Sequence, residues 1–147
     1  MNPVLKNILA VVVGLVVGGV VNSGIIMLGG AIVSPPPGID PMDVESIRAG
    51  MEAGLYSPQH FIVPFLAHAL GTLVGAFLAA RIAANRKMIF ALSIGVLFLI
   101  GGIIAATMLP APAWFVVLDL VVAYIPMAWL GGILAAGRNP STVERAM

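Results

Sequence analysis

The chain has 147 residues, of which 61% are apolar and 9% charged, with a net charge of +1 and no cysteine. Soluble domains carry about 25% charged residues, so this chain has too few charges to cover a water-exposed surface and is too apolar to be disordered. Without cysteine, disulfide, thiol-redox, iron–sulfur and cysteine–zinc chemistry are excluded, and without a basic stripe nucleic-acid binding is not expected. We expect one domain, residues 1–147, embedded in a lipid bilayer.

Four apolar segments are long enough to cross a membrane as helices, which takes about 20 residues. They cover residues 4–33, 58–84, 88–108 and 113–136, with an outer loop at 34–57. These segments are apolar on all sides and do not alternate as the strands of a transmembrane barrel would, so helices are expected. The predicted fold is all-α, a polytopic membrane protein with four transmembrane helices in one bundle.

The first and the second apolar segment each begin with a helix-capping signal. Asn2 precedes Pro3, and Ser57 precedes Pro58, which are both pairs that suit a helix N-terminus. The three consecutive prolines at 35–37 cannot continue a helix. These signals predict where the first helix begins and stops and where the second begins.

A short amphipathic helix is predicted in the outer loop. Asp40 can cap it, Pro41 suits its first position, and Asp43 favours its positive end. Apolar residues then recur at helical spacing at Val44, Ile47, Met51 and Leu55. Such a helix of about 13 residues would lie on the outer membrane surface. It would either cover the ends of the spans or form a lid over a polar pocket.

Basic residues indicate the orientation. Lys6 lies at the start of the first span. Arg81, Arg86 and Lys87 lie between the second and third spans, and Arg138 and Arg145 follow the fourth. The outer loop carries four acidic residues against Arg48 alone, and the loop between the third and fourth spans carries no charge. The positive-inside rule then places both termini in the cytoplasm of a bacterial-type inner membrane.

Small residues recur at four-residue spacing within the spans. The rows are Gly14 and Gly18, Gly71 and Gly75, Gly131 and Ala135, and Ala128, Gly132 and Ala136. Small residues let helix backbones approach closely in lipid, where dispersion and not the hydrophobic effect drives association. We expect a tight bundle, and the additional small faces could serve a homo-oligomer or a partner membrane protein. Pro126 lies inside the fourth span, where it should kink the helix.

Asp119 is the one charged residue inside an apolar segment, and the other charges lie between or at the ends of the segments. At about 1.5 Å per residue, Asp119 lies roughly 10 Å from the outer start of its span and His68 roughly 15 Å from the start of its own. Asn22, roughly 24 Å from the inner boundary, reaches the same outer half. A lipid-facing charge costs about 2.5–3.5 kcal/mol, so Asp119 should face inward and bind His68, or else Asn22, Thr72 or Tyr124.

This polar intramembrane site has two interpretations. It is either a buried clamp that fixes the register of the helices or a proton-responsive or ligand-binding site open to the outer side. His60 is expected to cap its helix near the interface. No catalytic motif is present, the two histidines are too far apart to share a metal, and we expect no metal and no cofactor.

Three stretches resemble a family of small bacterial four-helix membrane proteins. They are Phe65-Leu-Ala-His-Ala-Leu-Gly-Thr72, Leu109-Pro-Ala-Pro-Ala-Trp-Phe115 followed by Asp119, and Tyr124-Ile-Pro-Met-Ala-Trp-Leu-Gly-Gly132. The resemblance covers nearly the whole chain and implies membrane location and four helices, but no site residue. In size the chain is also similar to small multidrug-resistance transporters, which carry a membrane-embedded glutamate in the first helix where this chain has no acid.

Two functions follow as hypotheses. The first is a homo-oligomeric transporter or channel-like protein whose site is Asp119 and His68. The second is a non-catalytic accessory or structural subunit that binds a partner protein or lipid through glycine-rich helix faces. An enzyme or a quinone-binding redox subunit is a third reading, which no motif supports.

Overall fold

A computed structural model describes residues 2–137, and all regular secondary structure in this range is helical. The helices are α1 (Pro3–Gly29), α2 (Val44–Glu52), a short 3-10 helix η1 (Pro58–Phe61) leading into α3 (Ile62–Ile82), α4 (Lys87–Met108), α5 (Ala113–Val122) and α6 (Ile125–Ala136). Four helical segments are long and apolar enough to span a membrane, with α5 and α6 together making the fourth. Two of the basic residues used for the orientation, Arg138 and Arg145, lie outside the described residues.

Local contacts set the helix ends, and two of these ends differ from the prediction: the C-terminus of α1 and the N-terminus of α2. Asn2 caps α1 by accepting a hydrogen bond from the Val4 amide at 2.9 Å. The helix ends at Gly29, four residues earlier than expected, because Gly29 and Gly30 are weak helix formers and the chain then turns, with the Ile32 and Val33 amides both donating to the Gly29 carbonyl.

The predicted loop helix is present as α2, but it is shorter than expected. Its N-cap is Asp43, whose side chain accepts from the Glu45 amide at 3.1 Å, and not Asp40. Asp40 instead forms a turn by accepting from the Met42 amide, so Pro41 lies in this turn outside the helix. The helix covers nine residues.

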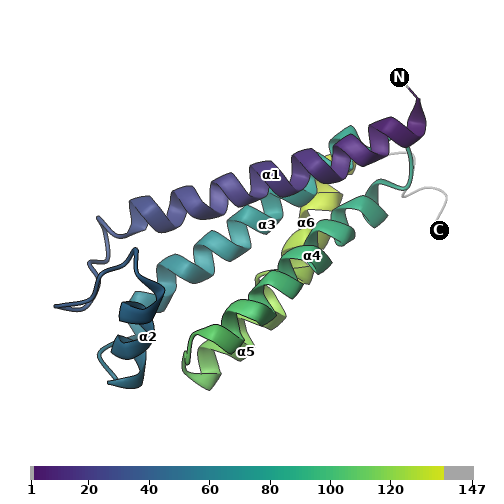
Figure 1. Ribbon diagram of the computed structural model, residues 1–147. Coiled ribbons are helices and arrows are strands. Elements are labelled where there is room, and N and C mark those ends of the chain that lie inside the picture. The colour runs from purple at the N-terminus through teal and green to yellow at the C-terminus, as the bar shows by residue number, and fades with distance from the viewer. Residues whose placement is uncertain (1, 138–147) are drawn as a thin grey trace.

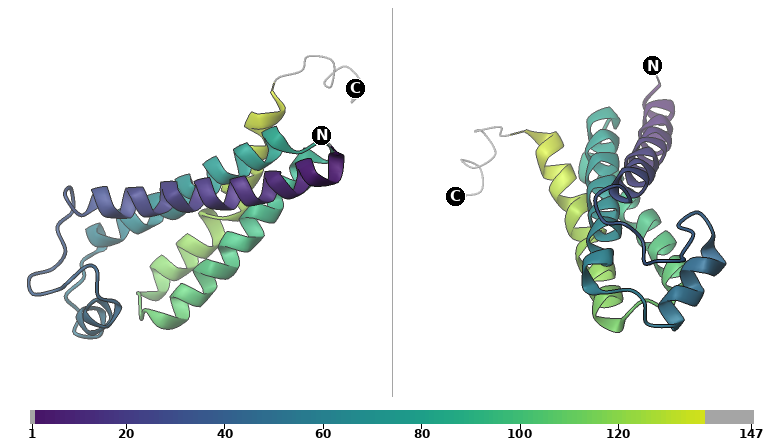
Figure 2. Two further views of the ribbon diagram at one scale, coloured as in Figure 1. Left: turned by 45° about the horizontal axis from the view of Figure 1, so that its top comes forward. Right: turned by 90° about the vertical axis from the view of Figure 1, so that its left-hand side faces the viewer.

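The four long segments alternate in direction and diverge at one end, as Figure 1 shows. At the terminal end, where α1 begins and α6 finishes, the helices lie close together. At the loop end, where residues 30–57 and 109–112 connect the helices, the pair α1 and α3 separates from α4 and α5 (Figures 1 and 2). Helix α3 is central, since it packs against α1, α4 and α6. Helix α2 lies at the loop end.

Paired glycines bring α1 and α3 into backbone contact. A Cβ atom added at Gly14 would lie 2.8 Å from the Gly75 carbonyl oxygen, and one added at Gly18 would lie 2.7 Å from that of Gly71. Real Cβ atoms do not approach this closely, so a larger residue would push the helices apart. The predicted small-residue packing is therefore used inside one chain.

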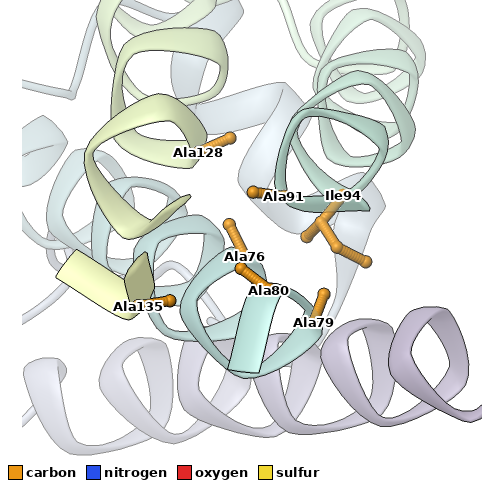
Figure 3. Packing of buried hydrophobic residues seen from close by; sticks show 7 residues of the cluster. All are labelled: Ala76, Ala79, Ala80, Ala91, Ile94, Ala128 and Ala135. Carbon is orange, nitrogen blue, oxygen red and sulfur yellow. The ribbon is translucent and has the colours of Figure 1, made fainter. Parts of the chain in front are cut away.

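The terminal half is filled by alanines from three helices, shown in Figure 3. Ala76, Ala79 and Ala80 of α3 meet Ala91 and Ile94 of α4 and Ala128 and Ala135 of α6, all at most 1% exposed. Gly131 lies against the α3 backbone, where an added Cβ would be 2.7 Å from the Leu73 carbonyl oxygen, and Gly132 lies against Met88 of α4. Such small side chains leave no room for water between these helices.

Large apolar side chains cover the outside of the bundle. Val20 of α1, Ile104 of α4 and Val121 of α5 are each more than half exposed, and every long helix carries further exposed large apolar side chains. Soluble proteins seldom expose continuous apolar surface of this kind, whereas lipid solvates it. The chain therefore has the architecture of a multi-pass membrane protein.

Candidate functional site

Three polar side chains meet near the loop end. One comes from α3, one from α5, and one from the junction between α5 and α6. His68 of α3 places Nδ1 2.9 Å from both carboxylate oxygens of Asp119 on α5. The Tyr124 hydroxyl donates to Asp119 Oδ2 at 3.1 Å. Asp119 is 5% exposed and Tyr124 3%. We call these three residues the carboxylate cluster.

An interruption of the helix in the fourth span lets the Tyr124 side chain contact Asp119. Residues five apart in a regular helix point about 140° away from each other, so an unbroken helix would direct Tyr124 away from Asp119. The chain instead leaves α5 at Val122 and starts α6 at Ile125, with Tyr124 at φ −112°, ψ −77°. The helix is thus interrupted beside Pro126, where a kink was predicted, and Pro126 lies in the first turn of α6.

The Tyr124 ring is held between two helices. Its plane stacks on the His68 ring at a centroid distance of 5.7 Å and an interplanar angle of 28°. On the other side its hydroxyl group lies against Gly102 of α4, where a Cβ would clash with it. Gly102 was not predicted to belong to the site, and only the general recurrence of small residues in α4 hinted at it.

A cavity of about 250 Å³ lies beside the cluster, between α1, α3, α4 and Tyr124. Asn22, His68, Thr72, Gly102 and Tyr124 are among the residues that line it. We call it the amide cavity because Asn22 contributes its side-chain amide. The amide oxygen of Asn22 is buried and has no hydrogen-bond donor within reach among residues 2–137.

A second cavity of about 300 Å³ opens at the loop end, and we call it the apolar cavity. Its walls come from α1, α3, α4 and α5, and both His68 and Asp119 line it. Ile47 and Met51 of α2 also line it. Two of the four residues of the predicted apolar stripe thus face this space. The α2 helix therefore covers a cavity that is lined by two members of the cluster, His68 and Asp119.

The rim of the apolar cavity carries two further titratable side chains. Tyr56 lies on this rim, and burial raises the pKa of its phenol above the ordinary value of 10.0, so it is neutral at physiological pH. His60 also lines the cavity, and its Nδ1 lies 3.0 Å from the Ser57 amide that donates to it, which is the capping role expected from the sequence. The rim therefore adds no fixed charge of its own.

The cluster can hold or release a proton. With Asp119 ionised, the carboxylate only accepts hydrogen bonds, so His68 Nδ1 must carry a proton toward it. The other ring nitrogen, Nε2, is then an acceptor in neutral imidazole and a donor in the protonated ring. A carboxylate-oriented imidazole beside a cavity can therefore exchange a proton or bind a polar ligand group.

The structure brings together some of the predicted site residues and separates others. His68 and Tyr124 contact Asp119 directly, whereas Asn22 and Thr72 make no hydrogen bond to it and lie on the wall of the amide cavity. Helix spacing placed His68 and Thr72 on one face, but the two cavities could not be found from spacing. Among residues 2–137 no three metal-ligating side chains gather in one place.

Comparison with known proteins adds no relative. No protein-family model, no curated protein and no solved structure matches the chain. The functional argument therefore rests on the residues and their geometry.

Proposed function

We propose that this protein is a small homo-oligomeric transport or channel-like protein of a bacterial-type inner membrane, in which the carboxylate cluster is the ligand or proton site. The observation that carries the proposal is that His68 and Asp119 line the apolar cavity at the loop end. With both termini in the cytoplasm, as the basic residues favour, that cavity opens to the outer side.

The alternative role of the cluster as a clamp accounts for less of the geometry. A clamp needs only that Asp119 be paired, and His68 and Tyr124 already supply that. It does not require cavities on the wall beside the pair or an unpartnered amide oxygen on Asn22. Membrane-embedded ionisable groups that adjoin a cavity are typical of ion and substrate pathways.

Passage across the membrane requires a second opening. In the terminal half, Ala76, Ala80 and Ala128 belong to one close-packed core, so the described part of one chain offers no open path there. The two helix groups that diverge at the loop end, α1 with α3 and α4 with α5, would have to separate further, or a path would form between copies. Either route lets water reach the cluster from the terminal side at some time.

A thiol-accessibility experiment tests this requirement, and the natural absence of cysteine makes it clean. Ala106 lines the apolar cavity on α4, so Ala106→Cys reports access to the site. A small membrane-impermeant thiol reagent is applied to right-side-out and to inverted vesicles. We expect labelling from both sides, and we expect Asp119→Asn to slow labelling from the terminal side at least tenfold.

The matched control is Val96→Cys on the same helix, which is 46% exposed on the apolar surface and should react from neither side. Labelling of Ala106→Cys from the loop side alone would overturn the transport proposal and favour the accessory-subunit reading. Equal labelling rates with and without Asp119→Asn would show that the cluster has no part in access.

The alternative function is a non-catalytic accessory subunit that binds a partner membrane protein or lipid. Two glycines of α1, Gly19 and Gly24, have nothing within 4 Å of an added Cβ and are free to contact another chain. The mass of the protein in lipid discs distinguishes the cases. A defined homo-oligomer supports the first proposal, whereas a monomer that co-purifies stoichiometrically with one membrane protein supports the second.

A further inference from the structure

We infer that the two cavities bind an uncharged lipophilic molecule with a hydroxyl group, which lies in the amide cavity while the apolar body lies in the apolar cavity. The inference deepens the proposed function, on which it rests, by naming the class of ligand. It follows from three properties of the described residues: unpaired donors and acceptors on one wall, the absence of an unpaired charge there, and the apolar space beside it.

The unpaired polar groups of the amide cavity include both an acceptor and donors. The buried amide oxygen of Asn22 has no donor within reach among residues 2–137. The Asn22 amide nitrogen and the Thr72 hydroxyl can donate, and both side chains line the cavity. The Thr107 hydroxyl donates to a carbonyl oxygen of its own helix, whereas the Thr72 hydroxyl makes no such bond within the described part of the chain. Because a buried polar group without a partner is unfavourable, a ligand group that both donates and accepts suits this wall best.

His68 adds a third polar group, and a hydroxyl suits it in either protonation state. Its Nδ1 lies 2.9 Å from Asp119, so Nε2 is the ring nitrogen left for a ligand. Nε2 accepts a hydrogen bond when Nδ1 carries the only ring proton, and it donates when the ring is protonated or when the proton of the pair resides on Asp119. A hydroxyl can bond to either form. The choice of ligand group therefore does not depend on where this proton lies.

The amide cavity offers no unpaired charge to an ionic ligand. Among residues 2–137, no aspartate, glutamate, lysine or arginine lines it. Asp119 lines only the apolar cavity, where its oxygens are bonded to His68 and Tyr124. If the His68 ring is protonated, Asp119 already neutralises it. An ion brought to this depth without an opposite charge is unfavourable, so the geometry favours an uncharged ligand.

The apolar cavity beside this wall accounts for the lipophilic body. His68, Gly102 and Ala105 line both cavities, so the two adjoin. The apolar cavity is bounded mainly by aliphatic and aromatic side chains and is covered by Ile47 and Met51. The two volumes, about 250 and 300 Å³, together fall in the range of about 300–1,000 Å³ that is common for ligand sites with a few convergent polar groups. Water alone would satisfy the polar wall but not the apolar one.

The test uses four eight-carbon probes in lipid discs, with empty discs to subtract partition into lipid. Octanol both donates and accepts, its isomer heptyl methyl ether only accepts, and octylammonium and octanoate carry opposite charges. Equilibrium dialysis at neutral pH measures binding. We expect saturable binding of octanol about tenfold tighter than that of the ether, the loss expected for one or two hydrogen bonds. Both ions should bind more weakly than octanol.

Two substitutions assign the preference to its groups. Asn22→Leu removes the amide at nearly constant volume and should abolish the preference for octanol over its isomer. Thr72→Val keeps the shape of the side chain without the hydroxyl and should weaken octanol at least threefold. Ser23→Ala is the matched control, because Ser23 is the next residue on α1, is exposed and lines neither cavity. It should leave all four probes unchanged.

Several results would overturn the inference. Absence of saturable octanol binding would mean that water alone fills the amide cavity. Equal binding of octanol and the ether would show that the donor is not recognised, and tighter binding of either ion would show that the site recognises charge. An octanol preference that persists in folded Asn22→Leu would show that the amide does not contact the ligand. Folding of each variant is checked by its unfolding temperature in the same discs.

The outcome is separable from that of the proposed function. Two-sided labelling of Ala106→Cys without saturable octanol binding would leave the transport proposal standing and reject this class of ligand. Octanol binding with labelling from the loop side alone would establish a ligand site in a protein that does not transport.

Discussion

The helices are closely packed at the terminal end of the bundle and leave cavities between them at the loop end. At the terminal end, alanines of α3, α4 and α6 fill the space between the helices and are almost completely buried. At the loop end, α1 and α3 separate from α4 and α5 (Figure 2), and cavities of about 250 and 300 Å³ lie there. The polar groups of the bundle interior that bond across helices lie in this second region.

The difference shows where stability and chemistry are placed in this chain. Close contact in the terminal half comes from many weak dispersion contacts between small residues. In the loop half, fewer contacts hold the helices, and the interaction of Asp119 with His68 and Tyr124 links α3 to the fourth span. A change in the first region should affect folding, and a change in the second should affect the site with a smaller cost in stability.

The largest loss of stability is expected from widening the contact between α1 and α3. Gly14→Val would place a Cβ 2.8 Å from the Gly75 carbonyl oxygen and 2.9 Å from Ile94, so the helices must move apart at a cost of about 3 kcal/mol. The matched control is Gly19→Val on the same helix, where nothing lies within 4 Å. Unfolding in detergent by denaturant titration should separate the two variants. Equal losses would mean that helix propensity and not packing sets the effect.

The next largest effect is expected at the carboxylate cluster. Removing one partner of a hydrogen bond to a charged group costs about 1.5–3 kcal/mol, so His68→Ala and Asp119→Asn should each destabilise by that order. The double variant should cost less than the two single losses added together, because the interaction is lost only once. Additive losses in the double-mutant cycle would show that the His68–Asp119 contact contributes nothing to stability.

A smaller effect is expected at the position that holds the tyrosine. Gly102→Val would push the Tyr124 ring away from its place beside α4 and break its bond to Asp119, which we expect to cost about 1–2 kcal/mol. The neighbouring Gly101→Val meets no atom within 4 Å and serves as the control. In a Tyr56→Phe background, the ring NMR signals of Tyr124 and the unfolding midpoint together report the change. A Tyr124 signal unaltered in Gly102→Val would contradict the packing described for this ring.

The smallest effect is expected on the surface of α2. Arg48 and Glu52 form an exposed ion pair at 3.0 Å, and exposed pairs one helical turn apart contribute about 0.3–0.5 kcal/mol. Arg48→Ala should therefore shift the unfolding midpoint within experimental error and leave access to the apolar cavity unchanged. A shift comparable to that of His68→Ala would mean that α2 stabilises the loop half far more than its exposed contacts indicate.

Depth along the helices predicted the central pair of the site. Counting residues from the helix starts placed Asp119 and His68 in the same half of the bundle, and the two side chains do meet. The same counting could not decide the place of Asn22, which reaches the right depth but faces the amide cavity. Depth is one coordinate, and the rotation of each helix about its axis is the other.

Local signals predicted two helix starts correctly and missed a third, because Asp43 and not Asp40 caps α2. Asn2 and Ser57 occupy N-cap positions as expected, because a cap is a contact between residues close in sequence. Pro126 was expected to kink the fourth span, and the span is interrupted directly before it, between Val122 and Ile125. A proline removes one hydrogen bond locally, but how far the chain then turns depends on what the neighbouring helices offer.

The sequence by itself determined the four long apolar helices and a short set of candidate partners for the one embedded carboxylate, with His68 first among them. Polar groups are so scarce in these segments that each has very few partners to choose from, and an unpaired charge is too costly to tolerate. Only the tertiary structure decided that Tyr124 joins the pair, that Gly102 makes room for it, and that two cavities adjoin it beneath α2. Those features depend on helix rotation and crossing, which are set by the sum of many small contacts that no single residue pattern encodes.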